Sequence, residues 1–386
     1  MTDSLRNLFL LNPAVTFLNH GSFGACPQPV FETYQRWQRE LEHQPVEFLG
    51  RRFNDLLREA RSTLADFVGA DADEITYVTN ATVGLNTVAR SLELHPGDEV
   101  LSTDHEYGAL DRTWRFLCEK SGAKYIRQPI AVPINHADEV IDAVWSGVTD
   151  RTRVLFISHI TSPTAIILPI RELIRRARER GILTIIDGAH AVGQIDLNLH
   201  DLGADFYSSN CHKWLMSPKG SAFLYARREV QHLVEPLVVS WGWQSEKPSA
   251  SRFIDEQEWQ GTRDIAAYLS VPAAIQFFHD HKWTAVRQQC HEIVRYAREQ
   301  ATALTGLPPL TPDDAAWFSQ LSALPLPPCD LDALKTRLYN EYHVEIPVIR
   351  WNNRHFVRIS IQGYNPRADV DTLIGALRDL LPQVAP

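Results

Sequence analysis

Short apolar runs alternate with longer helical patterns between residues 75 and 225. Five of the runs are rich in β-branched residues and end in polar or small side chains, as strands of a buried parallel sheet do. A sixth run follows the fifth too soon for a long crossover and predicts an antiparallel strand. The pattern therefore predicts an α/β fold with a mostly parallel sheet between helices. The runs start at Ile75, Glu99, Arg153, Ile182, Ala204 and Gly220.

Helical periodicity covers most of the remaining chain. The segment 237–261 is an exception: it is rich in Trp, Ser and Pro without a clear period, and it predicts a long ordered loop. Three amphipathic patterns around a strand-like stretch at 355–363 predict a separate, smaller α+β domain at the C-terminal end. We expect an N-terminal segment at 1–30, a large domain at 31–264 and a small domain at 265–386. The helices are expected at 29–43, 51–68, 169–181, 283–305, 330–342 and 369–381.

Composition and charge narrow the classes of protein that fit. The 386 residues carry a formal net charge of −9, the opposite of what a binder of nucleic-acid backbone needs. Five cysteines without a C-x-x-C pair argue against a disulfide framework and a cysteine zinc site, and we expect no metal. The first residues lack a secretory or membrane-spanning pattern. We expect a soluble, cytoplasmic, enzyme-sized protein with no nucleic-acid or membrane partner.

Asp187 and Lys213 are the most informative pair. Asp187 closes an apolar strand, and Lys213 follows the next predicted strand, so both are expected at the carboxyl edge of the sheet. A carboxylate and an amine from neighbouring strand ends are what pyridoxal phosphate (PLP) needs, because the lysine forms an imine and the acid keeps the pyridine nitrogen protonated. Alternatively, such an Asp caps a helix and such a Lys is solvated.

The stretch TNATVGLN follows the first predicted strand and opens a helix. Small residues at Ala81 and Gly84 and hydroxyls at Thr79 and Thr82 lie at the junction. A helix start offers free backbone N–H groups and a positive dipole end, which suit a phosphate. Ordinary capping by Asn80 or Thr82 explains the same residues.

Together these motifs resemble the fold-type I PLP enzymes of aminotransferase class V, and within them an isopenicillin N epimerase-like branch. The resemblance covers nearly the whole chain and implies a seven-stranded, mostly parallel sheet between helices. Each motif is weak alone and specific in combination. The motifs are LNHGSFGACP near the start, HEYGA from His105, SPTAIILPI from Ser162, DGAH from Asp187, HKWL with PKG from His212, and GTRD from Gly261.

The resemblance implies roles for individual residues around the PLP cofactor. Lys213 would bind it covalently and move the proton at Cα, Asp187 would pair with the pyridine nitrogen, and His190 would hydrogen-bond the ring oxygen where desulfurase relatives carry Gln. Thr262 would reach the phosphate of a neighbouring subunit, which implies a homodimer. The phosphate would be bound by Ala81 and Thr82, with Ser209 or Asn210 and with His212.

Other residues would cover the cofactor and hold the amino acid substrate. Tyr107 is expected to cover the cofactor's face, with His105 as the alternative. Arg358 resembles the arginine that grips the substrate carboxylate, a task that suits a guanidinium fork. A strand arginine is also commonly a surface ion pair, and Arg354 competes for the role. Residues expected to border the substrate are Asn19, His20, Ser22 and Ser162, and also Trp241 and Trp243.

Several reactions remain open for such a site. Reprotonation of Cα on the opposite face gives an epimerase, our first choice, and loss of a β-substituent gives a C–S lyase for cysteine conjugates such as hercynylcysteine sulfoxide; transamination is less favoured. An epimerase needs a second proton donor besides Lys213, with His20 and Tyr107 as candidates. A cysteine desulfurase is disfavoured, because no Cys lies between Asp330 and Arg358 and Cys329 follows two prolines.

Two other classes of protein are also conceivable. A regulatory protein could keep the cofactor fold, but it would have no need of Lys213, Asp187 and the phosphate site together. A nucleotide-binding dehydrogenase would fit the alternation of strands and helices. The chain has no G-x-G-x-x-G after an early strand, however, which argues against it.

Overall fold

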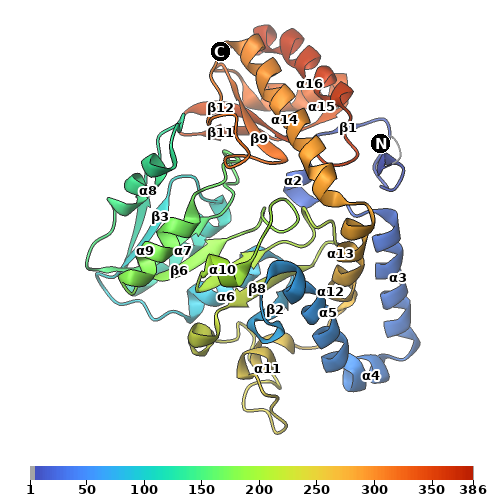
Figure 1. Cartoon of the computed structure of the whole chain (residues 1–386), viewed down its shortest axis with the longest axis vertical. Coiled ribbons are helices and arrows are strands. Elements are labelled where there is room, and N and C mark those ends of the chain that lie inside the picture. Colours follow the sequence, from blue (N-terminus) through green and yellow to red (C-terminus); the bar gives the residue numbers. More distant parts are fainter. Residues whose placement is uncertain (1–4, 386) are drawn as a thin grey trace.

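The computed structural model describes residues 5–385 and has two lobes, a large one around a central sheet and a small one formed mainly by the C-terminal part of the chain (Figure 1). Residues 1–4 of the predicted N-terminal segment and residue 386 lie outside the described residues. The strand order in the central sheet is β2-β8-β7-β6-β5-β3-β4, and β8 alone runs against the others. The mostly parallel sheet and the antiparallel sixth run are therefore confirmed. The strands are β2 (Ile75–Val78), β3 (Glu99–Thr103), β4 (Lys124–Gln128), β5 (Thr152–Ser158), β6 (Leu183–Asp187), β7 (Phe206–Ser209) and β8 (Ala222–Ala226).

The central strands are apolar on both faces because helices cover both. In β5, Leu155 and Ile157 belong to one hydrophobic cluster, whereas Val154 and Phe156 belong to a second one on the opposite face. Helix α9 shows the matching pattern, with a buried stripe at residues 170, 173, 174 and 177. The helices of the large lobe are α2 (His20–Phe23), α3 (Gln28–His43), α4 (Pro45–Glu47), α5 (Phe53–Val68), α6 (Ala81–Ser91), α7 (Gly108–Ser121), α8 (Ala137–Trp145), α9 (Ile170–Glu179), α10 (Leu199–Leu202), α11 (Arg252–Glu258), α12 (Ala266–Leu269) and α13 (Val271–Asp280).

The register of the parallel strands brings polar residues together at one edge of the sheet. Ser158 at the end of β5 pairs with Asp187 at the end of β6, and Asp187 pairs with Ser208 of β7. Because parallel strands share a direction, the loops that follow them leave the sheet side by side. The turn that carries Lys213 follows β7 at this edge.

The small lobe contains an antiparallel sheet of order β11-β12-β9 covered by helices. The N-terminal segment joins this lobe, since β1 (Thr16–Phe17) pairs in parallel with β10 (Val344–Glu345). Helix α2 follows directly and lies near the junction of the two lobes (Figure 1). The elements of the lobe are β9 (Leu321–Leu326), β11 (Val348–Trp351), β12 (Arg354–Ser360), α14 (Trp283–Thr305), α15 (Leu331–Tyr342) and α16 (Arg367–Leu380).

The segment predicted as a long loop contains a helix. Within 237–261, α11 is fixed by a buried ion pair between Arg61 of α5 and Glu258. Its short length and polar sequence hide it from a periodicity analysis. Strand β4 was also missed, because this edge strand is partly exposed and mixes charged with apolar residues.

The proposed domain boundary between residues 264 and 265 stays a prediction. In the structure, α12 and α13 lie against α3 and α5 of the large lobe, and α14 is the first long helix of the small lobe (Figure 1).

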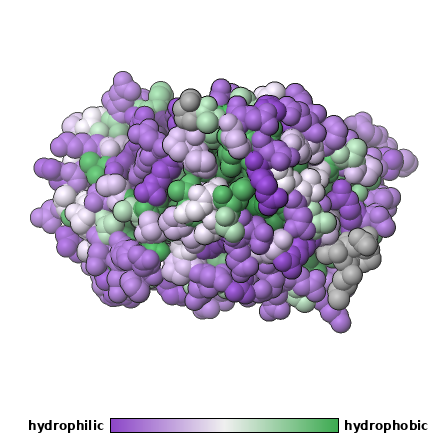
Figure 2. Space-filling model, turned by 90° about the horizontal axis from the view of Figure 1, so that it is seen from above, coloured by the Kyte–Doolittle hydropathy of each residue, from purple (hydrophilic) through white to green (hydrophobic). Residues whose placement is uncertain are grey.

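None of the helices within residues 5–385 combines the length and the apolar character that a bilayer crossing requires. Seen from above, the outer rim of the molecule is hydrophilic, and hydrophobic residues gather toward the middle of that face (Figure 2).

Candidate active site

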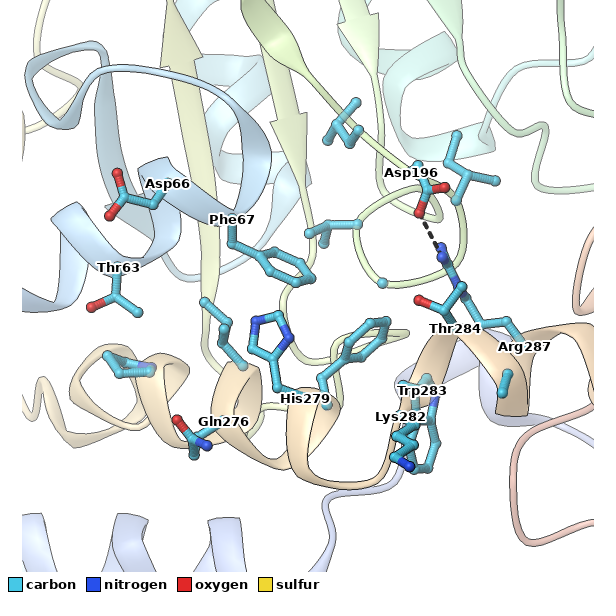
Figure 3. A pocket seen from close by; sticks show the side chains of 18 of the residues that line it. Thr63, Asp66, Phe67, Asp196, Gln276, His279, Lys282, Trp283, Thr284 and Arg287 are labelled. Atoms are coloured by element: carbon cyan, nitrogen blue, oxygen red, sulfur yellow. Dashed lines mark hydrogen bonds and ion pairs between the residues drawn. The ribbon is translucent and has the colours of Figure 1, made fainter.

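Three hollows among the described residues are large enough for a ligand of cofactor size, and they differ in chemistry. The third, of about 620 Å³, lies around α11 and contains neither Asp187 nor Lys213. The largest has a volume of about 920 Å³ and lies between α5, α13, the start of α14 and the loop after β6 (Figure 3). Asp196 and Arg287 point toward each other at its edge and form an ion pair of 2.5 Å. Lys282 at its rim is exposed. By volume alone this hollow would be the first candidate site, but neither Lys213 nor Asp187 lines it.

The second cavity, of about 680 Å³, lies at the carboxyl ends of the central strands. Residues from β6, the turn after β7, the start of α6, the loop before α7 and β12 converge on it. This is the convergence that the order of motifs along the chain predicts. The predicted site residues that line it are Ser22, Ala81, Thr82, Tyr107, Ser162, Asp187, His190, Asn210, His212, Lys213 and Arg358.

Asp187 and Lys213 are both largely removed from water in this cavity. Burial is the main cause that raises the pKa of the Asp187 carboxyl. One carboxylate oxygen of Asp187 accepts a 2.9 Å hydrogen bond from the backbone N–H of Ala189, which orients it. Burial, with a smaller contribution from the Arg358 charge, lowers the pKa of the Lys213 amine to about 7, while Asp187 opposes that change. The amine is therefore partly neutral near neutral pH and able to act as a nucleophile or a base.

His190 stands between Lys213 and the next residue, Trp214. Its Nε2 is 3.3 Å from the Lys213 Nζ, and its Nδ1 is 3.2 Å from the indole nitrogen of Trp214. Burial lowers the pKa of the His190 ring well below its usual value, so the ring is neutral. The neutral imidazole of His190 therefore lies next to the Lys213 amine in the lining of the cavity.

The start of α6 has a geometry compatible with the expected anion site. Asn80 caps the helix by accepting from the N–H of Val83 at 2.9 Å, and the Asn210 side-chain oxygen accepts from the N–H of Ala81 at 2.8 Å. The backbone N–H of Thr82 has no hydrogen-bond partner among the described residues, and Thr82 lines the cavity. Capping and anion binding are thus compatible here, because they use different N–H groups.

A hydrogen bond determines which ring nitrogen of His212, a predicted phosphate contact, carries the proton. Its Nδ1 lies 3.1 Å from the backbone oxygen of Ser221. A carbonyl oxygen accepts only, so Nδ1 carries a proton and Nε2 is bare in the neutral ring. Burial lowers the pKa of His212 to about 4. Donation to an anion from Nε2 would therefore require that the anion itself raise this pKa.

Arg358 is a buried guanidinium whose pairing is incomplete. It donates to the backbone oxygen and hydroxyl of Ser162, at 2.5 and 3.1 Å, and to the Ser22 hydroxyl at 3.4 Å. Its Nε has no partner among the described residues, and burial lowers its pKa to about 10. Arg354, on the same strand, is exposed and does not line the cavity. The geometry thus favours Arg358 over Arg354 as a carboxylate ligand.

Tyr107 and His105 occupy different environments. Tyr107 is 45% exposed and lines the cavity. His105 is fully buried outside it, with Nδ1 2.7 Å from the Thr164 hydroxyl, Nε2 2.9 Å from the Ile130 backbone oxygen, and Trp351 packed against its ring. Of the two candidates for covering a bound ring, the structure brings Tyr107 to the cavity.

Two residues of the N-terminal motif do not reach the cavity as expected. His20 is fully buried, and its Nε2 and Nδ1 lie 2.9 Å from the backbone oxygen of Lys213 and the hydroxyl of Tyr364, respectively. Asn19 donates to Glu345 and accepts from Ser22. Ser22, which was also expected at the site, does line the cavity, together with Gly21 and Phe23 of α2. A motif shows that its segment is near the site, but not which side chains turn toward it.

Four further residues expected at the site, Ser209, Thr262, Trp241 and Trp243, do not line this cavity. The Ser209 hydroxyl donates to the backbone oxygen of Gly188 at 2.5 Å, so Asn210 takes the cavity position that the sequence left open between them. Thr262 is exposed and does not line the cavity of its own chain. Trp241 and Trp243 are also exposed, and Trp241 lines a different hollow around α11.

Glu106 and Ser158 also lie at the site, although the sequence patterns did not single them out. Glu106, beside Tyr107, is buried, and both its carboxyl oxygens accept from hydroxyls: from Thr103 at 2.7 Å and from Ser158 at 2.6 Å. Burial, together with the nearby Asp187 charge, raises its pKa to about 8. The signal in the sequence that could have identified Glu106 was its position next to Tyr107 in the HEY motif. Ser158 lines the cavity, and the corresponding signal was its position at the end of a strand.

Comparisons with known proteins agree with this geometry. The aminotransferase class-V family model matches residues 24–373. The chain is 35% identical to isopenicillin N epimerase of Amycolatopsis lactamdurans over 389 aligned residues, covering 97% of each chain. It is 30% identical to putative L-cysteine desulfhydrase 1 of Oryza sativa subsp. japonica, covering 95% of this chain and 83% of the relative.

A solved structure supports the fold. A variant of C-DES with glycine covalently linked to its PLP cofactor superposes with a TM-score of 0.82 at 21% identity, covering 97% of this chain and 99% of that one. At this identity the likeness shows the fold alone, which is fold type I. The family match and the full-length relatives settle the affiliation: the chain belongs to the aminotransferase class V family of PLP-dependent enzymes.

Proposed function

We propose that this enzyme is an epimerase that inverts the Cα of an amino acid, in the manner implied by its resemblance to isopenicillin N epimerases. The observation that carries the proposal is that a buried amine, a buried carboxylate, an anion cradle and an incompletely paired guanidinium line one cavity. Each group suits one part of a PLP-bound amino acid. The epimerase relatives at full-length coverage add support.

The donor set of the cavity fits PLP. The Thr82 N–H at the start of α6, unpaired within the described part of the chain, suits a phosphate, and the buried Asp187 carboxylate suits a cationic ring nitrogen. The Nε of Arg358, without a partner among residues 5–385, suits the substrate carboxylate. When bound, the cofactor supplies an electron sink that makes the substrate Cα–H acidic.

The residues of this chain then divide the work. Lys213 would hold the cofactor and would transfer the proton at Cα on its own face of the substrate, for which a pKa near 7 is suitable. Asp187 keeps a proton on the ring nitrogen, and Arg358 orients the substrate through its carboxylate. Tyr107, which lines the cavity, would cover one face of the bound ring.

Inversion requires a second proton donor on the face opposite Lys213. His20, one of the two candidates from the sequence, is engaged with Lys213 and Tyr364 inside the protein. Tyr107 lines the cavity and is half-exposed. We therefore assign the second proton transfer to the Tyr107 hydroxyl.

A C–S lyase is the second candidate function, since relatives named L-cysteine desulfhydrases match at about 30% identity over most of the chain. Such a reaction would use the same Lys213 and would expel a β-sulfur instead of reprotonating Cα. A desulfurase remains disfavoured. Cys329 is buried, and no cysteine is among the described residues that line the cavity.

We further propose a cytoplasmic homodimer in which Thr262 reaches the phosphate in the neighbouring subunit. Thr262 is exposed and lies outside its own cavity, and the preceding segment carries Trp241 at 82% exposure. Large exposed apolar side chains are common at interfaces between proteins. The five free cysteines suit a reducing compartment, which cell fractionation would test.

The function is tested by incubating the holoenzyme in D₂O with a panel of amino acids and cysteine conjugates. The epimerase proposal predicts deuterium at Cα together with loss of optical purity, and no pyruvate. Chirality, pyruvate and released sulfur are measured on the same samples. Pyruvate with stoichiometric sulfur would favour the lyase, and no exchange with any substrate would contradict both.

Two variants serve as controls for the exchange experiment. Lys213→Ala should keep the fold and lose exchange by at least about 10³-fold, because it lacks the acid–base group. Tyr107→Phe should keep exchange with retention of configuration and lose inversion. Inversion at the wild-type rate in Tyr107→Phe would remove Tyr107 from the mechanism.

Arg358→Gln should raise KM for the amino acid by about 10 to 100-fold, since a charge-assisted hydrogen bond contributes roughly 1.5–3 kcal/mol. The matched control is Arg354→Gln, which alters an exposed arginine of the same strand and should leave KM within about twofold. Steady-state kinetics measure both. Equal effects of the two substitutions would contradict the assignment of Arg358.

The dimer is tested by mixing subunits. Thr262→Ala should weaken cofactor binding about tenfold through loss of one hydrogen bond to an anion. A hybrid of one Lys213→Ala and one Thr262→Ala subunit then keeps one intact site if Thr262 acts across the interface. Titration of the hybrid with PLP should show one site of wild-type affinity, whereas a weakened remaining site, or a monomer in sedimentation, would contradict the proposal.

A further inference from the structure

Trp214 follows Lys213 directly in the chain and points its indole nitrogen at His190. The ring is fully buried, packs beside the His20 ring at 5.0 Å, and belongs to a small apolar cluster with Ile160 and Leu321. An added Cβ at Gly21 would come within 3.4 Å of the indole. The indole is thus held in one orientation by packing from both lobes.

The hydrogen bond between Trp214 and His190 has a fixed direction. An indole N–H donates and cannot accept, so the Nδ1 of His190, 3.2 Å away, must be an acceptor without a proton. The single proton of the neutral ring then lies on Nε2. That nitrogen is 3.3 Å from the Lys213 amine, which accepts from it in its neutral form.

The surroundings of His190 keep the ring neutral. The charged or titratable groups that act on it are Lys213, Arg358, His20 and His212, and each of them disfavours a second proton on the ring. Burial acts in the same direction and is the largest cause that lowers the pKa of His190. The choice open to the ring is therefore between its two neutral tautomers.

We propose that Trp214 is a positioning residue that selects the Nε2–H tautomer of His190 and so makes this histidine a permanent hydrogen-bond donor to the ring oxygen of the cofactor. The cofactor half of this inference rests on the proposed function, which assigns His190 to that oxygen. The tautomer half rests on the geometry of the protein alone. A histidine without such a partner could present a bare Nε2, which would repel a negatively charged oxygen.

The first test needs no cofactor. Nitrogen NMR of the cofactor-free protein with ¹⁵N-labelled histidine, with the His190 signals identified by their loss in His190→Gln, should show Nε2 protonated and Nδ1 bare. Trp214→Phe removes the donor and keeps a packed ring, and it should change the tautomer ratio at least about fivefold toward Nδ1–H. A protonated Nδ1 in the wild type, or an unchanged ratio in Trp214→Phe, would overturn the proposal.

The second test uses the absorbance of the holoenzyme as a function of pH. A donor to the ring oxygen stabilises the state in which that oxygen carries more negative charge, which is the deprotonated state of the bound cofactor. Loss of the donor in Trp214→Phe should therefore raise the midpoint of the colour change by about one pH unit, a tenfold change in proton affinity.

The background His190→Gln separates positioning from packing. A glutamine amide offers N–H donors regardless of tautomer, so Trp214→Phe should cause no further shift of the midpoint in that background. An equal shift in both backgrounds would overturn the proposal, because Trp214 would then act through packing. A changed tautomer ratio without any midpoint shift would instead contradict the assignment of His190 to the cofactor, and with it that part of the proposed function.

If Trp214→Phe fails to fold, benzothienylalanine at position 214 replaces it in both tests. This analogue keeps the bicyclic shape and has sulfur in place of the N–H. The same tautomer change and the same midpoint shift are expected. Wild-type behaviour of the analogue would overturn the proposal.

Discussion

Asp187 at the end of β6 and Lys213 in the turn after β7 are groups of opposite charge that are shielded from water in one cavity. Burial raises the pKa of Asp187 and lowers that of Lys213, and the attraction between the two opposes both changes. Neither group would tolerate this environment without a partner. The PLP cofactor of the family offers a cationic ring nitrogen to the carboxylate and an aldehyde to the amine. Asp187 and Lys213 are therefore complementary to two different groups of one PLP molecule.

The turn that carries Lys213 is held by segments far apart in the sequence. His20 lies within hydrogen-bond distance of the Lys213 carbonyl, and a Cβ on Gly24 would fall 1.9 Å from the His212 carbonyl, at a φ of +70°. Gly193 approaches the backbone of Trp214 almost as closely. Glycine is needed where backbones approach so closely. The N-terminal motif thus contacts the backbone of the turn that carries Lys213 and only partly lines the cavity.

Sequence patterns predicted the central sheet and the pair at its edge, because apolar runs and their polar ends are local signals. They missed β4, whose mixed residues suit a half-exposed edge strand, and α11, which depends on the distant Arg61. Motifs brought the right segments to the site but could not orient side chains within them. His20 and Tyr107 show this clearly, since one turned inward to the lysine carbonyl and the other toward the cavity. The direction of a hydrogen bond, such as the one between Trp214 and His190, can be assigned only once the positions of both side chains are known.

The central claim is that Asp187 and Lys213 act on each other across one cavity. The most direct measurement is the pH dependence of Lys213 labelling by a small amine reagent in the cofactor-free protein, read by mass spectrometry against the exposed Lys120. The Lys213 midpoint should lie near pH 7 and should fall in Asp187→Asn, because the carboxylate raises the pKa of the amine. A Lys213 midpoint at the ordinary lysine value, or one unmoved by Asp187→Asn, would contradict it.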